Sequence, residues 1–442
     1  MRRKPILWLA VAMTLISVAA CGRGNGVGLI PPTATPPVPT APRPTALPSP
    51  TPTPLYLGLV QADEDLPVGH LVFSTALEAE EGVQVWVRSQ ARDDALPVLE
   101  FTRDNLWDCA PVASFCVMGD ETGEVYTFQP PDALSPLVPA GEDLQRAFVS
   151  PRGRFAGVVS GGFLALLDLQ DPARVVHVPQ VRAVGDVAWD GEDARLAFVA
   201  VDEDVERLFV MRLVPDLIPP ALIAENAEVL SPAWAGTQRK MAFIVRGLDH
   251  PRGGTQRRDV FVSDLETDEY LNLTETFGPL IDWIPAQPFG AASLRWALDD
   301  ETLDFVWVPP DERPDVGRVY RWIEGLDPQL VMAARLAPGQ GWSAPVRSPD
   351  GASEAAVAAI ESRGGAGELW VSPAGMESWG ALSPSDQDVI SFAWSPDGGY
   401  LAYVVDGDGI WVVPAAGGEA RRVVRAASPI QVRRLQWLGG VP

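Results

Sequence analysis

The chain of 442 residues has few lysines, histidines and cysteines. Lys4 and Lys240 are its only lysines, and 34 basic residues stand against 58 acidic ones, a formal net charge of −24. This balance excludes a nucleic-acid partner, because phosphate binding needs clustered basic side chains. The three histidines, His70, His177 and His250, have no His, Cys or carboxylate at ligand spacing. We therefore expect no metal site and no cofactor.

Signatures of catalysis and of helices are also missing. There is no G-x-S-x-G motif, and the body of the chain has no sustained 3.6-residue hydrophobic period. The D-G-D-G run from Asp406 to Gly409 fits a tight hairpin turn better than a calcium loop. From these absences we expect that the protein is not an enzyme and has no catalytic residues. A glycan hydrolase or lyase that uses Asp104 and Asp186 as paired carboxylates is the enzymatic alternative.

The N-terminus carries the only long apolar run. Three basic residues precede a 16-residue apolar run from Pro5 to Ala20, which is typical of a secretory signal and too short to span a membrane. The sequence Val18-Ala19-Ala20-Cys21 resembles the bacterial lipoprotein signal. The resemblance implies a signal peptide at residues 1–20, a lipid such as palmitate on Cys21, and a protein anchored at the extracytoplasmic face of the cell membrane. An ordinary secreted protein is the alternative.

Residues 21–54 predict a disordered linker. The stretch from Pro31 to Pro54 has 11 prolines and 6 threonines in 24 residues, a composition that favours extended polyproline II structure. This segment would hold a folded domain, residues 55–442, away from the membrane. A stalk that crosses a cell-wall layer or carries O-linked sugar is the alternative to a plain spacer.

The folded part is built on a repeat. The stretch WSPDGGYLAYVVDGDGIWVV from Trp394 combines two apolar runs with Gly-rich turns, and its seven-residue spacing from tryptophan to an aliphatic residue recurs three times. We call the tryptophan and its equivalents the anchors: Trp107, Val149, Trp189, Trp234, Trp296, Arg347, Trp394 and Trp437. Their separation of about 40 to 60 residues is the period of a four-stranded propeller blade.

We therefore predict an all-β protein, a β-propeller of eight four-stranded blades, with seven blades as the alternative. No room remains for a blade after Trp437, so the C-terminal strand is expected to close the ring within the first blade. The segments SPDGGYLAYV, SPRGRFAGVV and RSPDGASEA resemble the WD-like repeats of TolB-type propellers, over about residues 56–442. The resemblance implies the fold and a tendency to bind proteins, although the extra α/β domain of TolB is absent here.

Two features predict local structure and a binding site. Cys109 and Cys116 lie on neighbouring strands of one predicted hairpin, where they form a disulfide or remain two buried thiols. Three residues before each anchor stands a mostly polar ring, which we expect at one mouth of the central channel: Asp104, Arg146, Asp186, Ser231, Ser293, Ala344, Ser391 and Arg434. Crowding near the axis is the alternative reason for these short or solvated side chains.

Long insertions predict a second binding surface. They fall at 247–259, 276–293 and 309–317, and propeller geometry places all three on one sector of one face. His250, Arg252, Phe277, Trp283 and Phe289 are its candidate contact residues. The predicted function is a non-catalytic module that binds or scaffolds an envelope or secreted protein. A receptor for a glycan or small ligand at the channel mouth is the alternative.

Overall fold

The computed structural model describes most of the chain after the predicted linker. It describes residues 60–439 except for these segments: 78–81, 102, 111, 121, 140–142, 172–174, 179–183, 203–204, 215–217, 223–227, 237–238, 247–256, 268, 278–288, 298–300, 310–315, 338–340, 343, 361–365, 374–377 and 427–429. The chain divides into two units, Met1–Thr51 and Pro52–Pro442. The predicted signal peptide, Cys21 and the linker lie outside the described residues.

The described residues form strands and turns without an α-helix. Four sheets of four strands come first along the chain. Their strands, in spatial order, are β34 (Ile430–Leu438), β2 (His70–Leu77), β3 (Val83–Ser89) and β4 (Ala95–Phe101); β5 (Trp107–Ala110), β6 (Phe115–Gly119), β7 (Glu124–Gln129) and β8 (Ala133–Pro139); β9 (Leu144–Val149), β10 (Phe155–Ser160), β11 (Phe163–Asp168) and β12 (Val175–Val178); and β13 (Val187–Trp189), β14 (Arg195–Asp202), β15 (Val205–Arg212) and β16 (Ile218–Leu222).

A 13-stranded sheet and a five-stranded sheet follow. The larger sheet contains β17 (Glu228–Trp234), β18 (Lys240–Arg246), β19 (Arg257–Asp264) and β20 (Glu269–Asn272); β21 (Phe289–Trp296), β22 (Thr302–Val308), β23 (Val316–Ile323), β24 (Gln329–Ala337) and β25 (Gly341–Trp342); and β26 (Val346–Arg347), β27 (Ser353–Ile360), β28 (Ala366–Pro373) and β29 (Gly380–Ala381). The smaller sheet contains β30 (Val389–Trp394), β31 (Tyr400–Val405), β32 (Gly409–Pro414), β33 (Arg421–Ala426) and β1 (Val60–Ala62).

Two short links join the strands of the 13-stranded sheet, which the repeat did not predict as one sheet. β19 pairs with β21 in parallel over only two residues, and β24 meets β27 only at Ala334 and Ala358. The parallel link depends on Gly290, which has a φ of +100° and in which a Cβ atom would lie 2.3 Å from the carbonyl oxygen of Arg258. Glycine is thus what permits these two backbones to approach.

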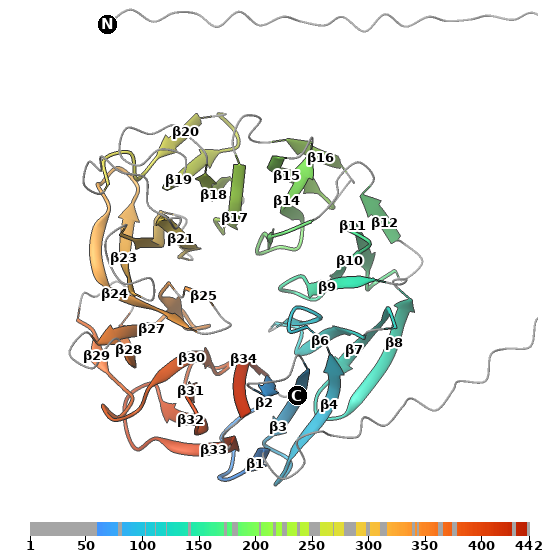
Figure 1. The fold of residues 1–442 in the computed structure, drawn as a ribbon, viewed down its shortest axis with the longest axis vertical. Helices are drawn as coiled ribbons and strands as arrows, with labels where there is room; N and C mark the ends of the chain where they lie inside the picture. The colour runs from blue at the N-terminus through green and yellow to red at the C-terminus, as the bar shows by residue number, and fades with distance from the viewer. Residues whose placement is uncertain are drawn as a thin grey trace, which may run out of the picture. The chain divides into compact units, whose positions relative to one another are not determined.

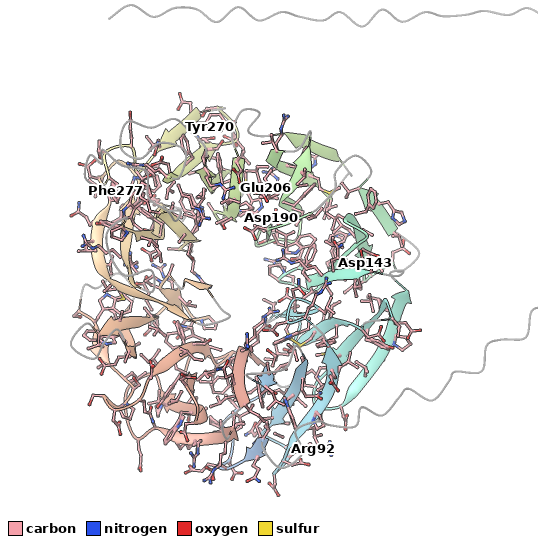
Figure 2. All side chains as sticks on the ribbon, viewed as in Figure 1. Arg92, Asp143, Asp190, Glu206, Tyr270 and Phe277 are labelled. Atoms are coloured by element: carbon pink, nitrogen blue, oxygen red, sulfur yellow. A yellow bond between two sulfur atoms is a disulfide. The ribbon has the colours of Figure 1, made fainter. Side chains whose placement is uncertain are left out.

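The sheets follow one another around a common centre, and side chains fill the spaces between neighbouring sheets (Figure 1, Figure 2). Strands such as β3 are buried along their whole length, because both faces pack against a neighbour. Between the sheet of β9–β12 and that of β13–β16, the ring of Phe155 on β10 stacks on that of Trp189 on β13 with centroids 6.0 Å apart. The anchors lie on β5, β9, β13, β17, β21, β26, β30 and β34. Of these strands, the labelled β9, β17, β21, β30 and β34 lie toward the centre (Figure 1).

The C-terminal strand pairs with a strand from the other end of the domain. β34 is antiparallel to β2 from His70–Leu438 to Leu77–Ile430 (Figure 1). The indole nitrogen of Trp437 also donates a hydrogen bond of 2.8 Å to the carbonyl oxygen of Val68. Near these strands, β1 extends the outer edge of β33, where Asp63 pairs with Arg422. Both ends of the domain are therefore held in sheets.

Candidate functional site

The polar ring predicted from the sequence contributes to a cavity near the starts of the innermost strands. This cavity, which we call the mouth cavity, has a volume of about 450 Å³. Three predicted residues line it: Arg146 from β9, Asp186 just before β13, and Arg434 from β34. Asp108, beside the anchor Trp107, also lines it and was not predicted. Aligning the repeats at their anchors does not mark position 108, because Asp108 directly follows its anchor and the predicted ring residues lie three positions before theirs.

Arg434 is held in place by the backbone of β5 and the segment before it. Its Nη1 donates to the carbonyl oxygens of Trp107 at 2.7 Å and Asp104 at 3.0 Å, and its guanidinium lies 4.5 Å from the centre of the Trp107 ring. Asp108 lies 3.5 Å from Nη2 of Arg434 and accepts a hydrogen bond from Gln436 at 3.2 Å. The cation is thus fixed at the cavity wall by carbonyls, a carboxylate and an aromatic face.

Arg146 also lines the mouth cavity. It donates to the carbonyl oxygen of Gly185 and lies 5.6 Å from the ring centre of Phe148. Burial lowers the pKa of Arg146, Asp186 and Asp108 raise it, and the nearby Arg434 lowers it. Two cations and two carboxylates therefore face one space, which suits a ligand or peptide with both donors and acceptors.

The remaining ring positions divide between this cavity and other surroundings. Asp186 Oδ2 accepts hydrogen bonds of 3.0 Å from both the backbone and the hydroxyl of Ser231, and Asp104 Oδ1 accepts one of 2.9 Å from the indole of Trp107. Ser391 is buried on β30. Each of the two carboxylates considered as a catalytic pair thus bonds its own protein partner, and Asp104 does not line the mouth cavity.

Ser293 and Ala344 line a second space, the Arg295 cavity, with a volume of about 380 Å³. Three anchor tryptophans also line it, Trp189, Trp234 and Trp296. Arg295 is the ionisable residue among its lining side chains. Trp189 borders both the mouth cavity and the Arg295 cavity.

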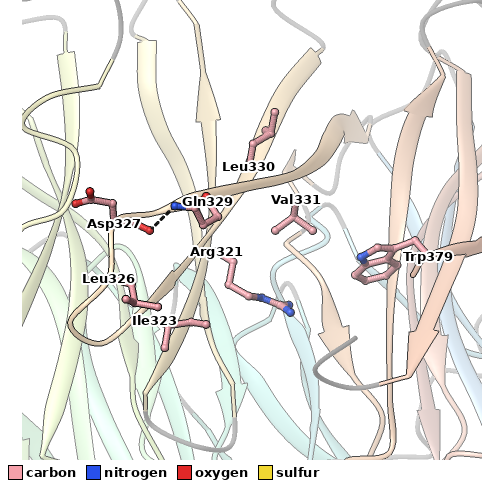
Figure 3. A pocket seen from close by; sticks show the side chains of 8 residues that line it. All are labelled: Arg321, Ile323, Leu326, Asp327, Gln329, Leu330, Val331 and Trp379. Atoms are coloured by element: carbon pink, nitrogen blue, oxygen red, sulfur yellow. Dashed lines mark hydrogen bonds between the residues drawn. The ribbon is translucent and has the colours of Figure 1, made fainter. Parts of the chain in front are cut away.

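A third hollow of about 330 Å³ lies on the outer side, between the β23–β24 hairpin and Trp379 (Figure 3). The exposed side chains of Ile323, Leu326 and Leu330 form its apolar part. Its cation, Arg321, is already paired: Nε and Nη2 each donate to Asp304 at 2.8 Å, and Nη2 also donates to Glu354 at 2.8 Å. The cation of the hollow is therefore committed to two carboxylates, and Asp327 is the other charged residue that lines it.

The aromatic residues predicted for the loop surface belong to the core instead. Phe289 is 4% exposed, and Phe277 packs its ring 4.7 Å from that of Tyr320 (Figure 2). Their position beside long insertions suggested surface anchors, but Phe289 is buried, and the half-buried ring of Phe277 packs against aromatic rings of β22 and β23. His250, Arg252 and Trp283 lie outside the described residues.

Cys109 and Cys116 form the disulfide that was one of the two predicted states of this pair. The structure joins Cys109 of β5 to Cys116 of β6, which face each other across the hairpin. Within the described segments, no three His, Cys, Asp or Glu side chains form a group that could hold a metal ion. The same segments contain no helix with the length and hydropathy needed to cross a membrane.

Comparisons with known proteins define the class of fold. The sequence matches no protein-family model and no curated protein. Among solved structures, the chain is similar to dihydro-heme d1 dehydrogenase NirN in complex with DHE, with a TM-score of 0.52 at 16% identity over 84% of this chain and 76% of that one. TolB from Acinetobacter baumannii gives a TM-score of 0.36 at 15% identity, over 84% and 82% of the two chains. Oligogalacturonate lyase in complex with manganese gives 0.47 at 12%, over 82% and 98%.

The fold is therefore that of the β-propeller proteins, as the repeat predicted. The prediction that the protein is not an enzyme, which was made from the missing catalytic motifs, was wrong. A dehydrogenase shares that fold, so a propeller without a hydrolase motif does not imply a non-catalytic protein. Identity at this level carries the fold alone, and the dehydrogenase's chemistry does not transfer with it.

Proposed function

We propose that this protein is a membrane-anchored lipoprotein whose propeller binds another protein at the mouth cavity. The observation that carries the proposal is the cluster of Arg146, Arg434, Asp108 and Asp186 around one space. Arginine and tryptophan dominate the binding energy of protein interfaces, particularly where they border a desolvated pocket. A polypeptide segment supplies the amide donors and acceptors that such a mixed lining would bind.

The predicted insertions support the same face. Glu228 at the start of β17 pairs with Arg246 at the end of β18, where the chain enters the segment 247–256. Because these two strands are antiparallel, the start of the innermost strand lies beside the end of the second strand. A partner at the mouth cavity would meet the face to which the segments 247–256 and 310–315 connect, which agrees with long connections as carriers of binding.

We infer eight blades, closed in the first sheet by β34. Without its two short links, the 13-stranded sheet divides into three sets, which with the five other sheets make eight. Lipidation of Cys21 and a location at the extracytoplasmic face of the cell membrane are proposed from the signal sequence. The linker at residues 21–54 would then present the propeller to an envelope or secreted partner.

Site-specific photocrosslinking in cells tests the binding proposal. A photoreactive amino acid at Asn105, which lines the mouth cavity, should capture one recurrent protein, and Arg146→Glu with Arg434→Glu should abolish that capture. The matched probe at Tyr270, an exposed residue at the outer edge (Figure 2), should not capture it. Equal capture from both positions, or capture that survives the charge reversals, would refute the site.

The alternative is a glycan or small polar ligand in the same cavity. It predicts no captured protein from Asn105, together with an increase in Tm of the purified protein when a glycan library member binds. Cys21→Ser tests the anchor separately, because the variant should lose incorporation of labelled palmitate and leave the membrane fraction. Palmitate incorporation that persists in Cys21→Ser would contradict lipidation at that residue.

A further inference from the structure

One arginine that lines a cavity has no partner within the part of the chain that the structure describes. Arg295, on β21, makes no hydrogen bond or ion pair with any described residue and lines the Arg295 cavity. Its side chain is accessible to solvent, yet the surrounding protein lowers its pKa by desolvation. This combination is typical of a group inside a recess rather than on an outer surface. A chain with a net charge of −24 has many carboxylates that could have neutralised it.

The carboxylate closest in register to Arg295 is already committed. Asp304 is the cross-strand partner of Arg295, and it raises the arginine's pKa. However, both of its oxygens accept hydrogen bonds from Arg321, each at 2.8 Å. The guanidinium of Arg295 can therefore bind a ligand in the cavity without first breaking an ion pair with Asp304.

The repeat shows that Arg295 departs from its pattern. It immediately precedes an anchor, and the equivalent residues of the other seven repeats are uncharged: Leu106, Phe148, Ala188, Ala233, Val346, Ala393 and Gln436. Ala188, Ala233 and Val346 use their carbonyl oxygens to accept an indole N–H from the next anchor. The anchor after Trp296 is instead Arg347, which pairs with Glu354 at 3.0 Å. No indole from that anchor is therefore available at Arg295.

Three tryptophans contribute to the walls of the cavity, although most of its accessible surface is polar. The indole nitrogens of Trp234 and Trp296 are bonded to Ala188 and Ala233, so these tryptophans can contribute only ring atoms to the cavity wall. The buried indole nitrogen of Trp189 has no partner among the described residues. A volume of about 380 Å³ falls within the range that holds small ligands in proteins. A ligand here would therefore meet mainly polar surface, with the tryptophan rings as the apolar part of the wall.

We propose that the Arg295 cavity binds a small organic carboxylate. The guanidinium of Arg295 would bind the carboxylate through two parallel N–H donors, Ser293 would offer a further hydroxyl, and the indoles would pack against the rest of the ligand. This site is separate from the mouth cavity, where cations and carboxylates balance each other. It does not depend on the proposed protein partner.

Ligand-observed fluorine NMR tests the site on the full-length protein in detergent. The probe is 4-fluorobenzoate, and its neutral analogue is 4-fluorobenzamide. We expect the benzoate signal to broaden and to give a saturable Kd, the benzamide to bind at least tenfold more weakly, and Arg295→Gln to lose the difference. Arg152→Gln is the control and should bind like the parent, because it removes an exposed arginine from the turn between β9 and β10.

Three results would overturn the proposal: equal binding of benzoate and benzamide, unchanged benzoate binding in Arg295→Gln, or displacement of the benzoate by an equal concentration of inorganic phosphate. Thermal unfolding gives a second readout. Because the parent holds an unpaired charge in a recess, Arg295→Gln should unfold at the same temperature or higher. A large decrease in Tm would instead show that Arg295 supports the fold.

Discussion

The hydroxyl of Ser150 donates a 2.7 Å hydrogen bond to the carboxylate of Asp193, which belongs to the neighbouring sheet. In two other repeats the carboxylate is local: Ser395 bonds Asp397 at 2.6 Å, and Ser348 bonds Asp350 at 2.5 Å. In the repeat that begins at Ser150, Arg152 replaces that aspartate. Asp193 supplies the missing acceptor and also binds the backbone N–H groups of Arg152 and Arg154, each at 3.1 Å.

Asp193 should stabilise the fold through the hydrogen bonds that it accepts from the neighbouring repeat. Asp193→Asn should lower the free energy of unfolding by about 1–3 kcal/mol, because Asp193 is buried and loses acceptor capacity for buried donors. Urea unfolding measures the change. Adding Arg152→Asp should restore part of it by returning the acceptor to its local position. Equal loss in the single and double variants would show that Asp193 acts in another way.

The disulfide gives the second prediction. Cys109 and Cys116 are seven positions apart, and closing so short a loop stabilises a fold by about 2–3 kcal/mol through the entropy of the unfolded chain. Reduction should therefore lower the free energy of unfolding by that amount. In Cys109→Ser/Cys116→Ser, the reductant should have no effect. A parent protein equally stable with and without reductant would contradict the prediction.

A pH dependence follows from two carboxylates in neighbouring sheets. Burial, and then the charge of Glu228, raise the pKa of Glu206, while Arg246 lowers it. A raised pKa means that folding binds a proton, so the contribution of Glu206 to stability is complete below its ordinary pKa of 4.5 and is lost as pH rises through the folded value. Glu206→Gln should then be more stable than the parent at pH 7, by less than about 1 kcal/mol, since the site is partly exposed.

Urea unfolding of both proteins between pH 4 and pH 8 measures this difference. We expect the two curves to converge toward the acid end. A gap that stays constant over the whole interval would show that Glu206 keeps the same pKa on folding. Glu124→Gln, on the surface of another sheet, is a control for general changes in net charge.

Removal of the C-terminal strand is the fourth prediction. A chain that ends at residue 429 lacks β34 and leaves the ladder of β2 without its partner from His70 to Leu77. We expect loss of cooperative thermal unfolding and aggregation through the exposed edge. Circular dichroism and size-exclusion chromatography measure both. Deletion of 440–442 alone should be tolerated, and a cooperative transition in the shorter chain would contradict closure by β34.

The sequence predicts most of the fold because each repeat contains its own signal. Trp394 and Leu401, seven residues apart, pair across β30 and β31, as Trp189 and Leu196 do across β13 and β14. Local spacing therefore reports local pairing. The parallel link through Gly290 was not predictable in this way, because it joins two repeats through a backbone contact that no hydrophobic period encodes.

The sites were harder to predict for a similar reason. The ring position identified Arg146, Asp186 and Arg434, since residues at one offset from the anchors meet at the centre. Asp108 was missed because it lies at a different offset. Arg295 did leave a signal in the sequence, a charge where the other repeats have none. Its meaning depends on Asp304 being occupied by Arg321, which only the packed sheets reveal.

The pairing of β2 with β34 has a consequence for synthesis. The backbone N–H of Arg434 bonds to the hydroxyl of Ser74 across 360 residues of sequence. A ribosome therefore releases β2 long before β34 exists, and the edge of β2 stays open to other chains until β34 has been synthesised.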